Sequence, residues 1–406
     1  MLALALALPL FTTLSACLAD SPSTEISDRH IAALIERLGD LEFDSRERAA
    51  SDLVKLGESA RTRLEHAQKT STDPEVRARA CDVLNRLVRA AEGVSDMERR
   101  AIESIRLLGG KFTLGSDPPG KQASDSPPKS VYLSWCKDPD EALQFLKELS
   151  GIQFVQLDHC RVTDDGLRHL EGHPSLKTVY LSNTRITADG LQHLAGVPKL
   201  ETLFLDNTPT TSEGVEHLVK LGGLKHLALH QTTVTDEGLK SVGKIKALQS
   251  LGLKQTRITD NGLVHLVGLK KLGSLGLDGT KVTDAGLIDL NKIKTLVRID
   301  LNGTAVTDAG MAHLADMPAL VRLELNGTMI GDTGLVTLKA LPSLQVLYLA
   351  NTRVSDSGLA TLTAFPKLTK VYVSNKVSDD QLVLLQEKLQ RPKEFPRIRV
   401  ERVREQ

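Results

Sequence analysis

Residues 155–178 read VQLDHCRVTDDGLRHLEGHPSLKT, and residues 179–202 read VYLSNTRITADGLQHLAGVPKLET. The two stretches match in phase, and the same 24-residue spacing runs without a gap through eleven units that start at Val131. A repeat of this length is typical of chains in which each unit contacts its neighbours and the stack closes one core. The repeat therefore decides the fold.

Two positions of the unit carry most of the pattern. The third place is leucine from Leu133 to Leu349 and valine at Val373, and a glycine recurs in one phase from Gly166 to Gly358. Glycine inside a helix costs about 1 kcal/mol relative to alanine. Nine glycines in phase therefore predict close packing between neighbouring units.

Each unit has two halves with different periodicity. The L-x-L half alternates as a half-buried strand does. The V-T-D-x-G-L-x-x-L half has helical spacing, with Thr or Ser as the helix cap and Asp in the first turn, where the helix dipole favours a negative charge. We expect one strand and one helix in each unit.

This pattern resembles the leucine-rich repeat family, specifically the class whose strand is followed by T-x-[VI]-T-D-x-G-L. The resemblance covers about residues 131–394. It implies an α/β solenoid, with a curved parallel sheet on the concave face and helices on the convex face. We assign residues 131–378 to the solenoid. We expect residues 379–406, with a helix near 381–389 and a strand near 398–400, to cap its open end.

The region before the repeats is expected to be helical. The segments FDSRERAASDLVKLG and DPEVRARACDVLNRL resemble HEAT-type helical repeats, which implies a small all-α module that packs or binds partners. We place this module at residues 24–92. Residues 93–130 are expected to form an N-terminal cap of the solenoid and a proline- and serine-rich loop.

The N-terminus reads as an export signal. Residues 2–16 are apolar but shorter than the roughly 20 residues that span a bilayer. They lead into LSAC at 14–17, which resembles the bacterial lipobox, in which the cysteine is lipidated. Residues 1–20 are therefore expected to direct the protein to the cell envelope, periplasmic or outer-membrane-tethered, with Cys17 as its lipid anchor and sole membrane contact. No Lys or Arg precedes the run, so a plain signal with an incidental Cys17 is the alternative.

The composition excludes several function classes. Lys plus Arg (51) equals Asp plus Glu (51), which argues against a generic polyanion binder, and four cysteines exclude a disulfide-dense scaffold. The stretch GSDPPGKQ at 115–122 has Gln where a phosphate-binding loop needs a hydroxyl. The sequence shows no catalytic constellation and no metal-ligand spacing, so we expect no cofactor, no metal and no enzymatic activity.

The second, fourth and fifth places of each strand are predicted to face out from the concave sheet. They hold six of the 13 aromatic residues, and all four tyrosines stand at the second place. Exposed strand sites favour aromatic residues in general, which is the alternative to a binding surface. We predict partner contacts at Tyr132, Trp135, Asp158, Tyr180, Phe204, Asp206, His230, Lys254, Asp278, Asp300, Glu324, Tyr348 and Tyr372.

The predicted face has a distinctive charge pattern. Its charged residues are acidic except for Lys254, and glycines or alanines leave its middle bare. This predicts an acidic groove with aromatic flanks, which suits a basic or polar protein segment better than nucleic acid, because phosphates select Lys and Arg.

The sixth place of the unit faces inward. It is mostly Thr, which predicts a ladder of hydroxyls bonded to loop backbone, and it is Cys136 and Cys160 in the first two units. Adjacent strands lie about 4.8 Å apart, so a disulfide is within reach, although inward thiols are the preferred interpretation. The histidines that share one helical place are expected to be solvated or half-packed: His169, His193, His217, His265 and His313.

Two functions compete. The first is a non-enzymatic, monomeric binding scaffold, exported and lipid-tethered, that holds a protein or peptide on its concave face. The alternative is an intracellular adaptor resembling the repeat half of ubiquitin-ligase F-box proteins. That alternative needs an F-box-like segment, which the helical region does not convincingly resemble.

Overall fold

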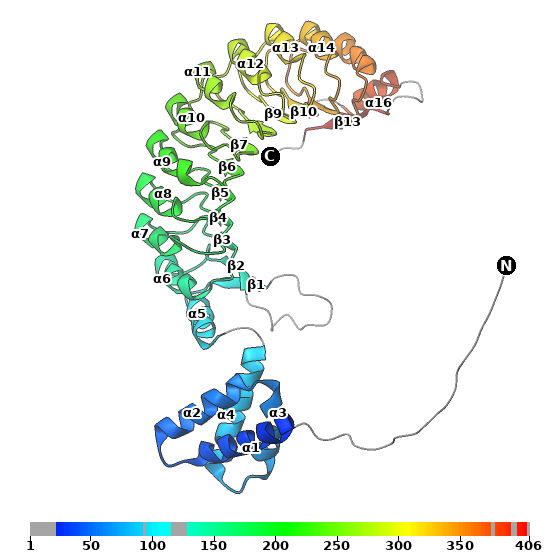
Figure 1. Ribbon diagram of the computed structural model, residues 1–406. Helices are drawn as coiled ribbons and strands as arrows, with labels where there is room; N and C mark the ends of the chain where they lie inside the picture. The colour runs from blue at the N-terminus through cyan, green and yellow to red at the C-terminus, as the bar shows by residue number, and fades with distance from the viewer. Residues whose placement is uncertain (1–21, 92–94, 115–127, 375–377, 391–395, 404–406) are drawn as a thin grey trace, which may run out of the picture. The chain divides into compact units, whose positions relative to one another are not determined.

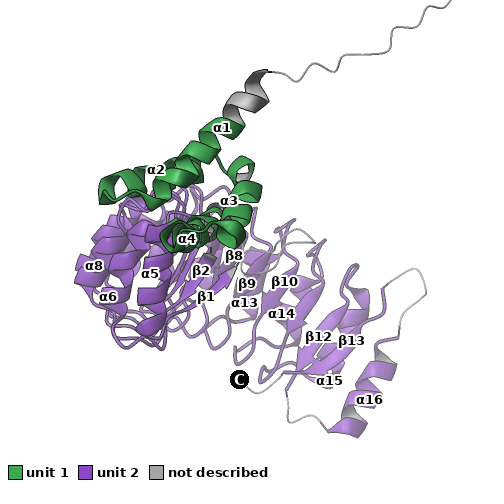
Figure 2. Cartoon of the chain, turned by 90° about the horizontal axis from the view of Figure 1, so that it is seen from below, with its two compact units in different colours: residues 1–95 green, residues 96–406 purple. Residues whose placement is uncertain are grey.

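The structure is a computed structural model that describes residues 22–91, 95–114, 128–374, 378–390 and 396–403. The chain divides into two compact units, residues 1–95 and 96–406 (Figure 2). The expected signal segment with Cys17 and the GSDPPGKQ stretch lie outside the described residues. No helix within the described ranges is both long enough and apolar enough to cross a bilayer.

The first unit is helical, as the spacing predicted. It comprises α1 (Pro22–Glu36), the 3-10 turn η1 (Arg37–Gly39), α2 (Phe43–Lys55), α3 (Glu58–Thr70) and α4 (Pro74–Ala91). One apolar cluster holds these helices together, with Ile31, Leu38, Leu53 and Leu64 almost fully buried. Its assignment to the HEAT class stays a prediction.

The second unit is the predicted leucine-rich repeat solenoid. Its strands form one sheet in chain order, in which β1 is antiparallel to β2 and the following pairs are parallel. Figure 1 shows the strands along the inner side of an arc and the helices along its outer side. The strands are β1 (Lys111–Leu114), β2 (Pro128–Tyr132), β3 (Phe154–Gln156), β4 (Thr178–Tyr180), β5 (Thr202–Phe204), β6 (His226–Ala228), β7 (Ser250–Gly252), β8 (Ser274–Gly276), β9 (Arg298–Asp300), β10 (Arg322–Glu324), β11 (Val346–Tyr348), β12 (Lys370–Val373) and β13 (Arg399–Arg402).

The outer side of the arc consists of short helices and 3-10 turns. The α-helices are α5 (Asp96–Leu107), α6 (Pro139–Gln144), α7 (Asp164–Leu167), α8 (Ala188–Leu194), α9 (Ser212–His217), α10 (Asp236–Val242), α11 (Asp260–Leu263), α12 (Asp284–Asn291), α13 (Asp308–Leu314), α14 (Asp332–Leu338), α15 (Asp356–Ala360) and α16 (Asp379–Lys388). The 3-10 turns are η2 (Phe145–Glu148), η3 (Arg168–Leu170), η4 (Leu218–Lys220), η5 (Val264–Leu266) and η6 (Thr361–Ala364). The helix and strand expected near the C-terminus are present as α16 and β13, and β13 pairs with β12.

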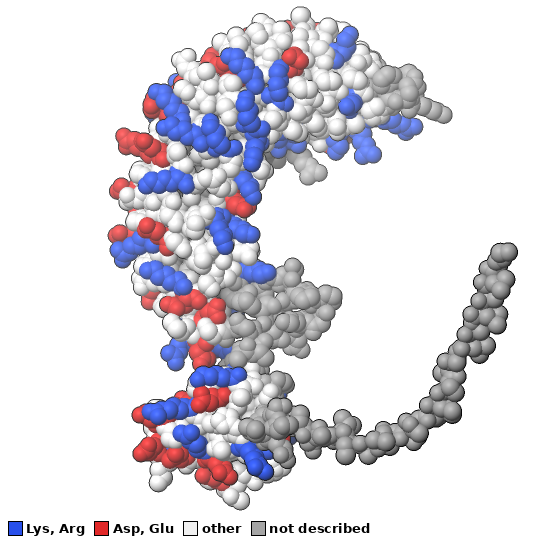
Figure 3. Space-filling model, viewed as in Figure 1, with Lys and Arg blue, Asp and Glu red and all other residues white. Residues whose placement is uncertain are grey.

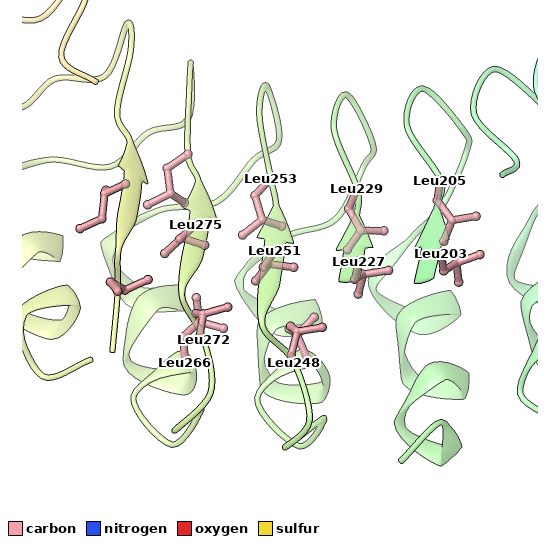
Figure 4. Close-up of a cluster of buried hydrophobic side chains, with 14 of the residues drawn as sticks. Leu203, Leu205, Leu227, Leu229, Leu248, Leu251, Leu253, Leu266, Leu272 and Leu275 are labelled. Carbon is pink, nitrogen blue, oxygen red and sulfur yellow. The ribbon is translucent and has the colours of Figure 1, made fainter. Parts of the chain in front are cut away.

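Leucines stacked in register build the core. From β2 to β12 the inward residue of each strand pairs with its counterpart 24 residues away on the next strand, as Leu227 does with Leu251 and Leu251 with Leu275. The third-place leucines form a second buried layer, seen for Leu229 and Leu253 in Figure 4. Burying each such side chain contributes roughly 1.5–3 kcal/mol, and the exact repeat keeps leucine against leucine along the stack.

The T-D motif joins consecutive units, which explains the glycines. Asp260 Oδ1 accepts from the Thr283 backbone N–H (2.8 Å), and Oδ2 accepts from the Thr283 hydroxyl (2.6 Å). A Cβ at Gly286 would overlap that Asp260 carboxylate. The predicted close packing at the glycines is confirmed. We call this arrangement the aspartate clamp, and both bonds recur in Asp140–Thr163, Asp164–Thr187, Asp236–Thr259, Asp284–Thr307 and Asp332–Ser355.

The sixth-place side chains point inward and bond to backbone, as predicted. The Thr256 hydroxyl donates to the Leu253 carbonyl at 2.6 Å, and the equivalent bond recurs from Thr184 to Thr352. Cys160 makes the same bond to the Leu157 carbonyl, and Cys136 and Cys160 are both free thiols. Burial raises the pKa of Cys160 to about 11, so it is a poor nucleophile at neutral pH.

Candidate functional site

Two rows of side chains project from the concave face of the sheet. In each three-residue strand the middle residue faces the core, while the first and third residues face outward. The third residues, with Tyr132, form what we call the trailing row: Tyr132, Gln156, Tyr180, Phe204, Ala228, Gly252, Gly276, Asp300, Glu324, Tyr348 and Tyr372. The first residues form the leading row: Phe154, Thr178, Thr202, His226, Ser250, Ser274, Arg298, Arg322, Val346 and Lys370.

The leading row was not predicted, because strand places were counted from the first valine or leucine of each unit. The residue immediately before that position belongs to the same strand and has the same outward parity. Extending the period-two alternation by one residue would have found it.

Four rings at the N-terminal end of the face form what we call the aromatic ladder. Phe154 lies between Tyr132 and Tyr180, with ring centroids 5.4 Å and 5.1 Å away. Tyr180 and Phe204 stack at 4.3 Å with planes 19° apart. Because Tyr180 and Phe204 are register partners on adjacent strands, the second face of the Phe204 ring points along the sheet toward Ala228.

An open cavity of about 550 Å³ extends along the sheet from β3 to β9, and Phe154, Tyr180 and Phe204 line its first part. Ala228, Gly252 and Gly276 lie along the trailing row at its floor. The predicted bare middle is only partly correct, because the His230 imidazole lies over Gly252 and itself lines the cavity. The Arg298–Asp300 pair lines its far end, and leading-row hydroxyls line its side. We call this space the central cavity.

Charged side chains beyond the central cavity neutralise one another. Arg298 Nη2 lies 2.8 Å from Asp300 Oδ2 and 3.2 Å from Glu324 Oε1, and Arg322 donates to the same Glu324 oxygen. The Asn302 amide donates to the other Glu324 oxygen at 2.7 Å and also to Asp278. We call these residues the ionic network. The predicted acidic groove, opposed only by Lys254, is wrong because two leading-row arginines fill its acidic end.

Burial acts differently on the two carboxylates of the ionic network. Asp300 is 7% exposed, and burial raises its pKa to about 6 despite the hydrogen bonds from Arg298. Burial also acts on Glu324, but hydrogen bonds from Asn302 and Arg322 outweigh it, so the pKa of Glu324 is lowered. Asp300 therefore titrates closer to neutral pH than its neighbour.

The last two tyrosines of the trailing row continue the ionic network. Tyr348 and Tyr372 stack at 4.1 Å with planes 10° apart. The Arg322 guanidinium lies 4.6 Å from the Tyr348 ring centroid, in cation–π contact. Arg322 is thus shared between an ion pair and an aromatic ring.

The predicted fourth-place residues brace the next unit. Asp158 Oδ1 accepts from the Ser182 N–H at 2.7 Å, Asp206 Oδ1 from the His230 N–H at 2.9 Å, and His230 Nδ1 from the Lys254 N–H at 2.9 Å. Burial also raises the pKa of Asp206. These groups are partly committed to the backbone and offer a partner less free charge than the sequence suggested.

The fifth place has a backbone role that the sequence analysis did not assign. Gly279, Gly303 and Gly327 have φ between 63° and 68°. Asn and Gln adopt the same left-handed conformation at this place in other units, so glycine here relieves backbone strain. Trp135, at the fifth place of the first unit, is 85% exposed.

Other candidate chemistry is limited in the described part of the chain. It contains no group of three or more His, Cys, Asp or Glu side chains placed to hold a metal ion. The five helical histidines are partly buried, and His193 Nδ1 lies 3.4 Å from Glu171.

Comparison with known proteins gives likenesses of fold alone. No protein-family profile and no curated protein matches this sequence. Among solved structures, internalin C2 of Listeria monocytogenes is 24% identical over 52% of this chain and 84% of that one, with a TM-score of 0.40. A second internalin of the same organism is 15% identical over 71% of this chain and 91% of that one, with a TM-score of 0.41. A chain from a complex of latrophilin 3, Unc5D and the leucine-rich repeats of FLRT2 is 17% identical over 62% and 88%, with a TM-score of 0.39.

Proposed function

We propose that this protein is a non-enzymatic binding scaffold that holds a protein or peptide partner on its concave face. The observation that carries the proposal is the central cavity, which opens between the aromatic ladder and the ionic network on one sheet face. Aromatic side chains and arginine are the residue types that most often anchor protein interfaces.

The central cavity favours an extended peptide segment. Phe204 and Asp300 stand four strands apart, roughly 19 Å at sheet spacing, which accommodates about five or six extended residues. The side-chain hydroxyls of Thr202, Ser250 and Ser274 line the cavity and make no hydrogen bond with another described residue. They are available to bond a peptide main chain.

An aromatic side chain of the partner fits best against Phe204. One face of that ring stacks on Tyr180, and the other faces the small side chain of Ala228. Beyond Ala228 the His230 imidazole lies over Gly252, where it could contact a second side of the anchor. The acid and the base at the far end, Asp300 and Arg298, are paired with each other. A neutral anchor therefore suits the cavity better than a charged one.

A glycan is a weaker fit than a peptide. Sugar rings stack on open aromatic faces, and a polysaccharide needs such faces at successive positions. Three rings of the aromatic ladder line the cavity, but they pack against one another at 4.3–5.1 Å, which reduces the ring surface left for sugars.

We also propose that the protein is exported to the bacterial envelope and tethered there through Cys17 as a monomer. The apolar run and the LSAC motif support this proposal. Cell fractionation with a Cys17→Ser variant tests it: the native protein is expected with the membranes and the variant in the soluble exported fraction. Equal distribution of the two would contradict the lipid tether.

Filling the central cavity is the sharpest test of the binding site. A Cβ at Gly276 meets no atom closer than 3.7 Å, so the backbone there accepts a side chain, and Gly276→Val places two methyl groups in the cavity. Gln156→Val is the matched control, in the same row but outside the cavity. Peptides selected from a random display library against the full chain are expected to share an aromatic residue. Gly276→Val should weaken the binding of these peptides at least about tenfold, and Gln156→Val should weaken it by less than about twofold.

Other outcomes would contradict the peptide site. These are selected peptides without a shared aromatic residue, equal binding by both variants, a glycan array hit with no peptide hit, or no binder at all. A second measurement separates this site from the scaffold function as a whole. Partner capture should fail in a Tyr180→Ala, Tyr348→Ala double variant and persist in the convex control Val264→Ala, Val336→Ala. If the tyrosine variant also retains its partners, the concave-face proposal itself fails.

A further inference from the structure

A lysine-rich edge runs along four consecutive units of the solenoid. The connections from helix to next strand at residues 218–225, 243–249, 267–273 and 291–297 contain eight lysines and no Asp or Glu. Figure 3 shows basic side chains gathered over α10 to α12, on the side that faces the viewer. The balanced charge of the whole chain conceals this local excess.

Few of these lysines have a carboxylate partner in the described structure. Lys225 pairs with Glu201, Lys292 with Asp289, and Lys294 with Asp316. The other five are exposed, and none forms an ion pair with a described residue: Lys220, Lys244, Lys246, Lys270 and Lys271. Their charge faces solvent uncompensated.

Helix stabilisation does not explain the pattern. Lysines near helix C-termini are favoured by the helix dipole, and that effect predicts them in every unit. The corresponding connections of the other units hold at most one lysine each, and four of them also hold an acid: Glu148, Glu171, Glu201 and Asp316. The excess of lysine is confined to four adjacent units, so it belongs to one patch of the surface and is not a general property of the repeat.

We infer that this lysine-rich edge rests on an anionic lipid surface. Clusters of four to eight basic residues bind anionic leaflets, each contributing through long-range attraction. The four connections contain no Arg, Phe, Tyr or Trp. Nucleic-acid sites usually combine basic groups with arginine contacts or aromatic stacking, so a membrane fits better.

The inference rests on the proposed export and tether, which place the chain beside a bilayer. A lipid chain plus a basic patch is a common two-part anchor. Contact through one edge of the arc would leave the concave face free for its partner.

Vesicle binding tests this edge directly. The probe is vesicles of 30% phosphatidylglycerol in phosphatidylcholine, compared with pure phosphatidylcholine, and the full chain carries Cys17→Ser so that no acyl group contributes. The patch variant is Lys244→Gln, Lys246→Gln, Lys270→Gln, Lys271→Gln. The matched control, with the same change in charge, replaces the exposed Lys147, Lys177, Lys199 and Lys339 by Gln.

The chain is expected to bind the anionic vesicles at least about tenfold more tightly than the neutral ones. The patch variant should lose this preference, the control should keep it, and 0.3 M NaCl should suppress it. Equal binding of both vesicles, or equal loss in both variants, would overturn the inference. Duplex DNA that competes better than vesicles at equal phosphate concentration would overturn it in favour of nucleic acid.

These measurements also separate the edge from the concave face. The patch variant should still capture the concave-face partner, because none of its four lysines lines the central cavity. Loss of vesicle binding with retained partner capture therefore supports both proposals. Retained vesicle binding in the patch variant overturns the edge and leaves the concave face unaffected.

Discussion

The aromatic ladder and the ionic network cover equivalent rows of the same sheet with opposite chemistry. At one end, ring centroids lie 4.3–5.4 Å apart across β2 to β5, two of the pairs tilted and one stacked. At the other, two arginines and two carboxylates interlock across β9 and β10. Both fit a spacing of about 4.8 Å between strands, which suits stacked rings as well as ion pairs. The difference is that the ladder depends on contact area and the network on charge.

Removing Glu324 should have the largest effect on stability. Glu324→Ala leaves Arg298 and Arg322 without their shared carboxylate and removes one of the two acceptors of the Asn302 amide. We expect a loss of about 3 kcal/mol in the free energy of unfolding, because a partly buried network loses its central group. Urea unfolding followed by far-ultraviolet circular dichroism measures it.

Glu237→Ala is the control for Glu324, because it removes an exposed ion pair with Lys240. Its expected cost is below about 0.5 kcal/mol. Equal costs for the two substitutions would show that the ionic network adds nothing beyond a surface pair.

Removing a ring from inside the ladder should cost less. Phe154→Ala removes two ring contacts and is expected to cost about 2 kcal/mol, whereas Tyr132→Ala at the end of the ladder removes one and should cost about half as much. The same urea titration compares them. If Tyr132→Ala is the more costly change, the rings are not acting as a ladder.

A pH change should distinguish the two ends further. Asp300 has a pKa of about 6 in the folded chain, raised mainly by burial, against about 3.9 when unfolded. The folded state therefore holds this proton more tightly, and stability rises as pH falls from 7 toward 4. As the pH falls from 7 to 5, we expect the free energy of unfolding of the native chain to rise by about 1 kcal/mol relative to that of Asp300→Asn.

Glu324 should not obscure that effect. Its pKa is lowered in the folded state and is about 4.3 in the unfolded state, so Glu324 is mostly ionised in both states above pH 5, and its contribution is lost only at lower pH. Phe154→Ala should show the native pH dependence. If the difference in the free energy of unfolding between the native chain and Asp300→Asn did not change with pH, it would contradict the buried position of Asp300.

Salt should produce the smallest effect. Raising NaCl from 0.05 M to 0.5 M screens exposed charges strongly and partly buried ones weakly. The cost of Glu324→Ala is expected to fall by a few tenths of a kcal/mol, and the cost of Phe154→Ala to stay constant. A larger fall for Phe154→Ala would mean that the ladder is stabilised by charge.

The repeat allowed the architecture of the solenoid to be predicted from the sequence. Leu227, Leu251 and Leu275 stand 24 residues apart and meet in register, so the phase of the sequence is also the phase of the sheet. The glycines were expected to mark close packing. The aspartate clamp that contacts them was not expected. An Asp in the first turn of a helix is already explained by its favourable interaction with the helix dipole, so the pattern did not indicate a contact with the next unit.

The concave face was predicted only in part. The tyrosines and Phe204 were placed on it, but Phe154 and the two arginines were not. Asp158 and Asp206 were expected to be free charges and instead accept hydrogen bonds from the next unit. A local sequence pattern does not indicate from which donors a carboxylate will accept hydrogen bonds.

The sequence by itself determined the repeat, the order of the strands and the inward leucine layers, because periodicity is a property of the chain. Tertiary structure alone decided how charges on neighbouring turns combine. Residues 24 positions apart are remote along the chain, yet coiling brings them within hydrogen-bond distance, where burial and geometry select the partner. The lysine-rich edge is the clearest case, since only the stacking of four turns gathers its charges on one surface.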